Sequence, residues 1–116
     1  SLLMMNREAT VTTCNLYTEN LVDKCKDADV IVSAAGAINL IDAEHVKEGA
    51  IVVDVGINFT EEGKMVGDVN YEAVKDKASF ITPVPGGIGA ITTTVLAYHL
   101  VKATEHQKEP VLFLEK

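Results

Sequence analysis

The segment from Thr82 to Thr94, TPVPGGIGAITTT, places two prolines and three glycines directly before an apolar stretch with helical character. Proline fixes the backbone dihedral φ and keeps the chain extended, whereas glycine has no Cβ and reaches conformations that other residues avoid. The helix that follows presents free N–H groups and the positive end of its dipole. This pattern favours a loop in which a ligand contacts the main chain. A tight turn whose glycines serve packing has the same pattern, and G-G-x-G is not the dinucleotide fingerprint G-x-G-x-x-G.

Two acidic residues, Asp54 and Asp68, are candidates for a carboxylate pair that does acid-base chemistry. Asp54 ends an apolar run and Asp68 lies in a predicted turn, where a carboxylate accepts hydrogen bonds from backbone N–H groups. We therefore predict structural roles for both residues.

The histidines and cysteines give weaker evidence of a functional site. His45 is predicted to be exposed on a short solvated helix, and His99 to be packed or half-buried on the last helix. Cys14 and Cys25 are too few for a disulfide scaffold and lack C-x-x-C spacing, so we predict buried or unreactive thiols. The spacing of His, Cys, Asp and Glu predicts no metal site.

Length and charge restrict the function further. A chain of 116 residues has the size of one domain. Seventeen acidic residues against ten basic residues give a net charge of -7, which repels phosphate backbones and anionic lipids and disfavours nucleic acid and membrane surfaces as partners. The sequence has no membrane-spanning run and no signal-peptide pattern, so we expect a cytoplasmic protein.

The elements that position these residues alternate between strand and helix. Strands are predicted at 9–13, 29–36, 50–56 and 79–82, and helices at 19–28, 42–49, 70–77 and 90–106. Thr18 and Asp42 are the predicted N-caps of the first two helices, Gly49 closes the second, and 58–69 is a loop or small hairpin. The apolar runs of the second and third strands predict burial on both faces. The fold class is α/β: a doubly wound, mostly parallel sheet with helices on both faces.

Glycines follow three of these strands: Gly36, then Gly56, then the group Gly86, Gly87 and Gly89. Parallel sheets bind ligands at the carboxyl ends of their strands. We therefore expect the three turns to lie along one edge and to let a ligand approach the backbone.

The chain ends carry two further signals. SLLMMNREA has the apolar spacing of a helix end without a start signal, so we expect a fragment that begins within a helix and lacks the first strand of its sheet. At the other end, the apolar residues 111–114 are expected to contact a further domain or an exposed sheet edge.

The segment PVPGGIGAITTTVL resembles the closing motif P-V-P-G-G-V-G-P-M-T of the bifunctional methylenetetrahydrofolate dehydrogenase/methenyltetrahydrofolate cyclohydrolase family. Four other segments occur in the family's order: ATVTTCNLYTENL, ADVIVSAAG, AIVVDVGIN and GDVNYEAV. The resemblance runs from about Leu2 to Ala103. It implies a Rossmann-like NAD(P)-binding domain at residues 1–104, with its first strand missing, and a tail at 105–116.

The resemblance also implies an activity. The family oxidises 5,10-methylenetetrahydrofolate to 5,10-methenyltetrahydrofolate with NADP or NAD and hydrolyses the product to 10-formyltetrahydrofolate. It acts as a homodimer that associates through this domain. The family's catalytic tyrosine and lysine belong to an amino-terminal domain that this chain lacks, so we expect the fragment alone to be inactive. The alternative is a stand-alone dinucleotide-binding or regulatory module without catalysis.

Site residues carried over from the family's motifs fall into two groups. On the tetrahydrofolate side, the resemblance implies Pro85, Gly86, Gly87 and Gly89. On the NADP side, it implies Leu16, Thr18, Ala35, Gly36, Gly56, Ile57, Asn58 and Thr92.

The chain departs from the family at several positions. Leu16 stands where relatives have a serine that helps to bind the 2′-phosphate of NADP. Losing that hydroxyl weakens the contact by roughly 1–2 kcal/mol, which keeps NAD open as the cofactor. Ile38 replaces a usual proline, and Ala90 and Ile91 replace Pro-Met. The neighbouring Tyr17 is either a surface residue or a stacking partner for adenine.

Overall fold

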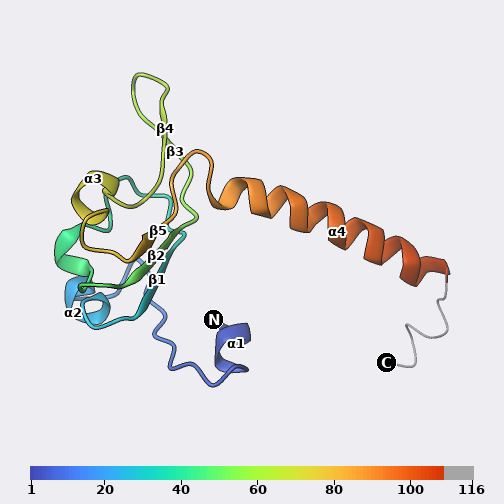
Figure 1. Ribbon diagram of the computed structural model, residues 1–116, viewed down its shortest axis with the longest axis horizontal. Coiled ribbons are helices and arrows are strands. Elements are labelled where there is room, and N and C mark those ends of the chain that lie inside the picture. Colours follow the sequence, from blue (N-terminus) through green and yellow to red (C-terminus); the bar gives the residue numbers. More distant parts are fainter. Residues whose placement is uncertain (109–116) are drawn as a thin grey trace.

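The computed structural model describes residues 1–108 and contains a three-stranded parallel sheet (Figure 1). Its strands are β1 (Val30–Ser33), β2 (Ile51–Asp54) and β5 (Phe80–Ile81), in the order β1-β2-β5. β1 runs in register with β2 from the pair Val30 and Ile51 to the pair Ser33 and Asp54. Because all three strands are parallel, their carboxyl ends lie at one edge, as predicted.

Three short helices cover one face of this sheet (Figure 1). They are α2 (Leu21–Cys25), the 3₁₀ helix η1 (Ala43–His45) and α3 (Tyr71–Val74). Between them and the sheet lies a small aliphatic core, formed by Ile31, Ile41, Val46, Ala50, Val52, Val69 and Val74. The parallel α/β arrangement predicted from the sequence is confirmed.

The other face of the sheet is open within residues 1–108. Side chains along β1 alternate between exposed and buried, and Val30, Val32, Ile51 and Phe80 are 39 to 62% exposed. The prediction that these strands are buried on both faces is therefore wrong for the described chain. The reason is that α1 (Leu2–Met5) and α4 (Ile88–Lys108) lie away from the sheet (Figure 1).

Helix α4 projects from the body of the molecule as a single rod of 21 residues (Figure 1). It raises the radius of gyration to 17.5 Å, above the value of about 13 Å typical of a compact domain of this size. Its described side chains from Gly89 onward are exposed, so the prediction of a packed or half-buried His99 is wrong. The helix begins two residues earlier than predicted.

The segment preceding α2 differs from the prediction. Residues 9–13 form no strand, because a strand needs a hydrogen-bonded neighbour and none of the described strands lies beside this segment. The N-cap of α2 is Asn20, with φ of 52°, and not Thr18. The Thr18 Oγ1 instead accepts a hydrogen bond from the Asn15 N–H at 2.8 Å and closes a turn.

The segment around η1 corrects another prediction. Asp42 is the N-cap, as predicted, and accepts a hydrogen bond from the Ala43 N–H at 2.6 Å. His45, predicted to be exposed, is buried, with 8% of its surface exposed. Its Nδ1 accepts a hydrogen bond from the Asp42 N–H at 3.1 Å, so the imidazole completes the helix cap instead of facing solvent.

The predicted hairpin is present as β3 (Asn58–Phe59) and β4 (Met65–Val66), which pair antiparallel and protrude from the body (Figure 1). α4 continues through Lys108, so the proposed domain boundary after residue 104 falls within this helix. The prediction for the tail concerns residues 109–116, which lie outside the described residues. None of the helices in residues 1–108 has the length and apolarity needed to cross a bilayer.

A pair of valines on adjacent strands tests which face of the sheet carries the core. Val52 has no exposed surface, whereas Val32 is 62% exposed. Val52→Ala should lower the free energy of unfolding by about 1–3 kcal/mol, because it removes two buried methyl groups. Val32→Ala should change it by no more than about 0.5 kcal/mol. Urea unfolding of both variants of the chain checks this, and equal losses would contradict the one-sided core.

Candidate functional site

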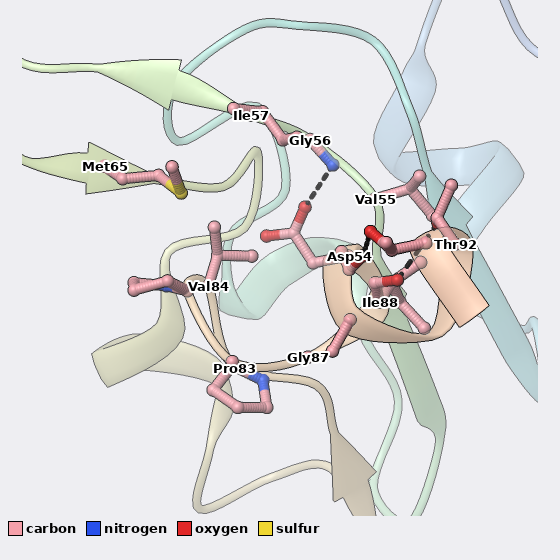
Figure 2. A pocket seen from close by; sticks show the side chains of 15 residues that line it. Asp54, Val55, Gly56, Ile57, Met65, Pro83, Val84, Gly87, Ile88 and Thr92 are labelled. Carbon is pink, nitrogen blue, oxygen red and sulfur yellow. Dashed lines mark hydrogen bonds between the residues drawn. The ribbon is translucent and has the colours of Figure 1, made fainter. Parts of the chain in front are cut away.

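A pocket of about 530 Å³ lies at the carboxyl edge of the sheet, where β2 and β5 end and α4 begins (Figure 2). It is lined by residues 54–57, by Met65, and by residues 83–90, 92 and 93. Its volume falls in the range of about 300–1,000 Å³ that is usual for ligand pockets. The loop singled out in the sequence therefore forms a large part of one cavity.

The walls of the pocket are mainly apolar. Val55 and Ile57 follow β2 on one side, Val84 belongs to the loop on the other, and Met65 comes from the hairpin (Figure 2). Among the polar groups, the Thr92 hydroxyl donates a hydrogen bond to the Ile88 carbonyl at 3.0 Å, which leaves its oxygen free to accept one from a ligand.

The loop's three glycines do not have the same role. A Cβ added at Gly86 or Gly89 would meet no atom within 4 Å, so these positions leave bare main chain in open space. Gly86 also has φ of +98°, a conformation that other residues rarely adopt. A Cβ at Gly87 would overlap the Pro83 carbonyl oxygen. Gly87 thus serves packing, while Gly86 and Gly89 leave room for a ligand.

Asp54 ties the floor of the pocket to neighbouring segments. Only 3% of its surface is exposed, and its Oδ1 accepts hydrogen bonds from the N–H groups of Gly56 at 2.9 Å and Asp68 at 3.1 Å. Its Oδ2 accepts one from the Val69 N–H at 3.0 Å. Its own N–H donates to the Thr82 Oγ1 at 2.8 Å, next to β5. The structural role predicted for Asp54 is confirmed.

Asp68 is fully buried and joins the turn after β1 to the hairpin. Its carboxylate accepts five hydrogen bonds, from Ser33 Oγ, the N–H groups of Ala35, Gly36 and Ala37, and Asn58 Nδ2. Burial is the strongest single influence and raises the Asp68 pKa, but the hydrogen bonds from Asn58, Ala35, Ser33 and Ala37 together bring the pKa below its ordinary value of 3.8. The group is therefore an anion at neutral pH.

The pocket brings together seven of the predicted site residues. These are Gly56, Ile57, Pro85, Gly86, Gly87, Gly89 and Thr92. Ala35, Gly36 and Asn58 do not line it, but they are held at the same edge through Asp68. Leu16 and Thr18 lie outside the pocket, and Leu16 is 90% exposed.

Sequence reasoning missed Met65 as a lining residue, because nothing in its surroundings indicated that this hairpin residue would reach the pocket. It also missed that the Asp68 carboxylate accepts hydrogen bonds from the turn after β1, although the segment GDVNYEAV was already noted for its resemblance to the family.

The remaining candidates have ordinary surroundings. Cys14 and Cys25 are free, half-buried thiols, and burial, followed by the nearby Cys14, raises the pKa of the Cys25 thiol, which lowers its reactivity. Tyr17 is 88% exposed. Within residues 1–108 no group of three or more His, Cys, Asp or Glu side chains is arranged to hold a metal ion.

Residues 1–108 match the model of the family described as tetrahydrofolate dehydrogenase/cyclohydrolase, NAD(P)-binding domain. The chain belongs to this family. The relatives include the bifunctional protein FolD of Bacillus subtilis strain 168, which is 52% identical over 89% of this chain, and that of Dictyoglomus thermophilum, which is 55% identical over 90% of it. The chain spans 36% and 37% of the length of these two relatives.

Solved structures of family members share the fold. The bifunctional enzyme FolD from Campylobacter jejuni superimposes with a TM-score of 0.87 and 48% identity, covering 90% of this chain and 37% of that one. The FolD of Trypanosoma brucei, whose structure contains NADP cofactor and an inhibitor, superimposes with a TM-score of 0.71 and 39% identity, covering 78% of this chain and 33% of that one. These structures confirm a Rossmann-like fold for this chain.

The difference between Gly87 and Gly89 is testable by stability. Gly89→Ala should raise the free energy of unfolding by up to about 1 kcal/mol, because alanine favours the first turn of α4 and meets no neighbour. Gly87→Ala should lower it by about 1–3 kcal/mol, because the new Cβ overlaps the Pro83 carbonyl. Urea unfolding of the two variants, each compared with the unchanged chain, measures both effects. A loss at Gly89 as large as that at Gly87 would show that both glycines serve packing.

Proposed function

We propose that this chain is the nucleotide-binding part of an enzyme that oxidises 5,10-methylenetetrahydrofolate to 5,10-methenyltetrahydrofolate with NADP, or with NAD, and hydrolyses the product to 10-formyltetrahydrofolate. Membership of the tetrahydrofolate dehydrogenase/cyclohydrolase family carries the proposal. Relatives named bifunctional FolD support both activities, and a family structure with NADP supports the cofactor.

The pocket fits a flat ring that contacts the main chain. At Gly86 and Gly89 a Cβ would occupy space that is open in the structure, so an aromatic ring can approach the backbone there. When bound, the nicotinamide supplies hydride acceptance. The role of this chain is to position the two reactants and to exclude water with the apolar side chains of Val55, Ile57 and Val84.

We assign the two groups of site residues to opposite sides of this pocket. Pro85, Gly86, Gly87 and Gly89 form the tetrahydrofolate side. The cofactor side comprises Gly56, Ile57 and Thr92 in the pocket, Ala35, Gly36 and Asn58 at the same edge, and Leu16 and Thr18 toward the 2′-phosphate. All of these contacts are part of the proposal.

The rest of the proposal concerns the protein that carries this chain. The tyrosine and lysine that act on the substrate belong to a separate domain, so the 116-residue chain binds nucleotide without turnover. The protein is a cytoplasmic homodimer that associates through this domain, and its product supplies one-carbon units for purine biosynthesis.

The decisive experiment measures reduction of NADP and of NAD by the protein that carries this chain, with and without 5,10-methylenetetrahydrofolate. We expect substrate-dependent reduction with at least one cofactor, followed by formation of 10-formyltetrahydrofolate. No reduction with either cofactor would reject the proposal, and nucleotide binding without turnover would favour the stand-alone binding module.

Cofactor preference is tested at Leu16. Leu16→Ser introduces a hydroxyl that donates a hydrogen bond to the 2′-phosphate, so the preference for NADP over NAD in kcat/KM should rise roughly tenfold. The control is Tyr17→Ser at the adjacent residue, which is 88% exposed. Loss of adenine stacking there affects both cofactors alike, so the ratio should stay constant. An unchanged ratio in Leu16→Ser would remove Leu16 from the 2′-phosphate site.

A further inference from the structure

The turn after β1 has the form of an anion-binding site. The N–H groups of Ala35, Gly36 and Ala37 converge on one carboxylate, at 2.7, 3.3 and 3.0 Å from its oxygens. Gly36 has φ of +70°, and successive N–H groups around a left-handed residue form a concave nest that attracts anions. Nests of this kind bind phosphate groups in many proteins.

In this chain the nest is already filled. Asp68, which has no exposed surface, supplies the anion, and the Ser33 Oγ and the Asn58 Nδ2 complete its coordination at 3.0 and 2.9 Å. All three N–H groups of the turn are therefore engaged by a side chain of the same chain, and none is left to a phosphate of a bound nucleotide.

The carboxylate is also connected to the pocket. The Asp68 N–H and the Gly56 N–H donate to the same oxygen of Asp54, and a Cβ at Gly56 would overlap the Asp68 carboxylate. Gly56 lines the pocket. A change in the position of Asp68 therefore moves both the turn after β1 and the pocket wall after β2.

We propose that Asp68 is a positioning residue for the nucleotide cofactor. Its carboxylate occupies the nest of residues 35–37, so the N–H groups of this turn do not bind the cofactor's phosphates. The turn contacts the cofactor through its carbonyl and Cα side instead. This inference rests on the proposed function. It assigns Asp68 no contact with the reacting atoms, and its effect is on cofactor binding through the turn.

The test uses the protein that carries this chain. Asp68→Ala empties the nest and should raise the KM for NADP or NAD roughly tenfold, because the turn that contacts the cofactor loses the anion that fixes its three N–H groups. The kcat at saturating cofactor should change by less than about threefold, because the variant weakens cofactor binding equally in the ground state and in the transition state. Sodium formate, a carboxylate small enough to enter the nest, should lower the KM again, whereas sodium chloride at equal ionic strength should not.

A second variant covers the case in which Asp68→Ala does not fold. Asp68→Asn keeps the shape of the side chain and removes its charge, and it should raise the KM for the cofactor roughly fivefold. The control is Asp42→Asn, which removes a carboxylate that accepts hydrogen bonds from the Ala43 N–H and the Asn70 Nδ2 away from the pocket. It should leave the KM for the cofactor unchanged.

The outcomes separate the two proposals. An unchanged protein that reduces neither cofactor rejects the proposed function. An active protein whose Asp68 variants keep the original KM, or lose kcat and stability with no change in KM, overturns the positioning role. A raised KM that formate does not lower in the folded alanine variant would overturn the inference that an anion must fill the nest.

Discussion

Two buried carboxylates, Asp54 and Asp68, hold the carboxyl edge of the sheet together by accepting hydrogen bonds from backbone N–H groups. A buried anion without such partners is unfavourable by several kcal/mol or more, so the surrounding turns must keep their donors aimed at the carboxylates. Hydrogen bonds of Asp54 join the ends of β2 and β5, and those of Asp68 join the turn after β1 to the hairpin. The edge that carries the pocket is therefore fixed by charge and not by an extended apolar core.

This constraint separates glycines that look alike in the sequence. Gly56 and Gly67 are required because a Cβ would overlap the carboxylates of Asp68 and Asp54, respectively. Gly86 and Gly89 meet no neighbour, and the space they leave opens into the pocket. The backbone needs glycine at Gly86, where φ is +98°, whereas nothing in the fold requires glycine at Gly89. The carboxyl edge needs both types, because a rigid edge must support a surface that a ligand can approach closely.

The sequence predicted the local features well. The apolar runs ending in Ser33 and Asp54 became parallel strands, and Asp42 became a cap, because such signals depend on residues close in the chain. Features set by distant partners were missed. Residues 9–13 have β-branched side chains but no neighbouring strand. The burial of His45 was also missed, although its capping partner Asp42 is only three residues away. Asp68 gathers donors from residues up to 35 positions away, which no local pattern encodes.

The long helix α4 has a mechanical consequence. Its first turn contributes Gly89 and Thr92 to the pocket, and at about 1.5 Å of rise per residue its far end lies roughly 30 Å away. A continuous helix is stiff, so a force that tilts the distant end turns the near end as a lever does. A tilt of the far end of α4 would therefore change the width of the pocket.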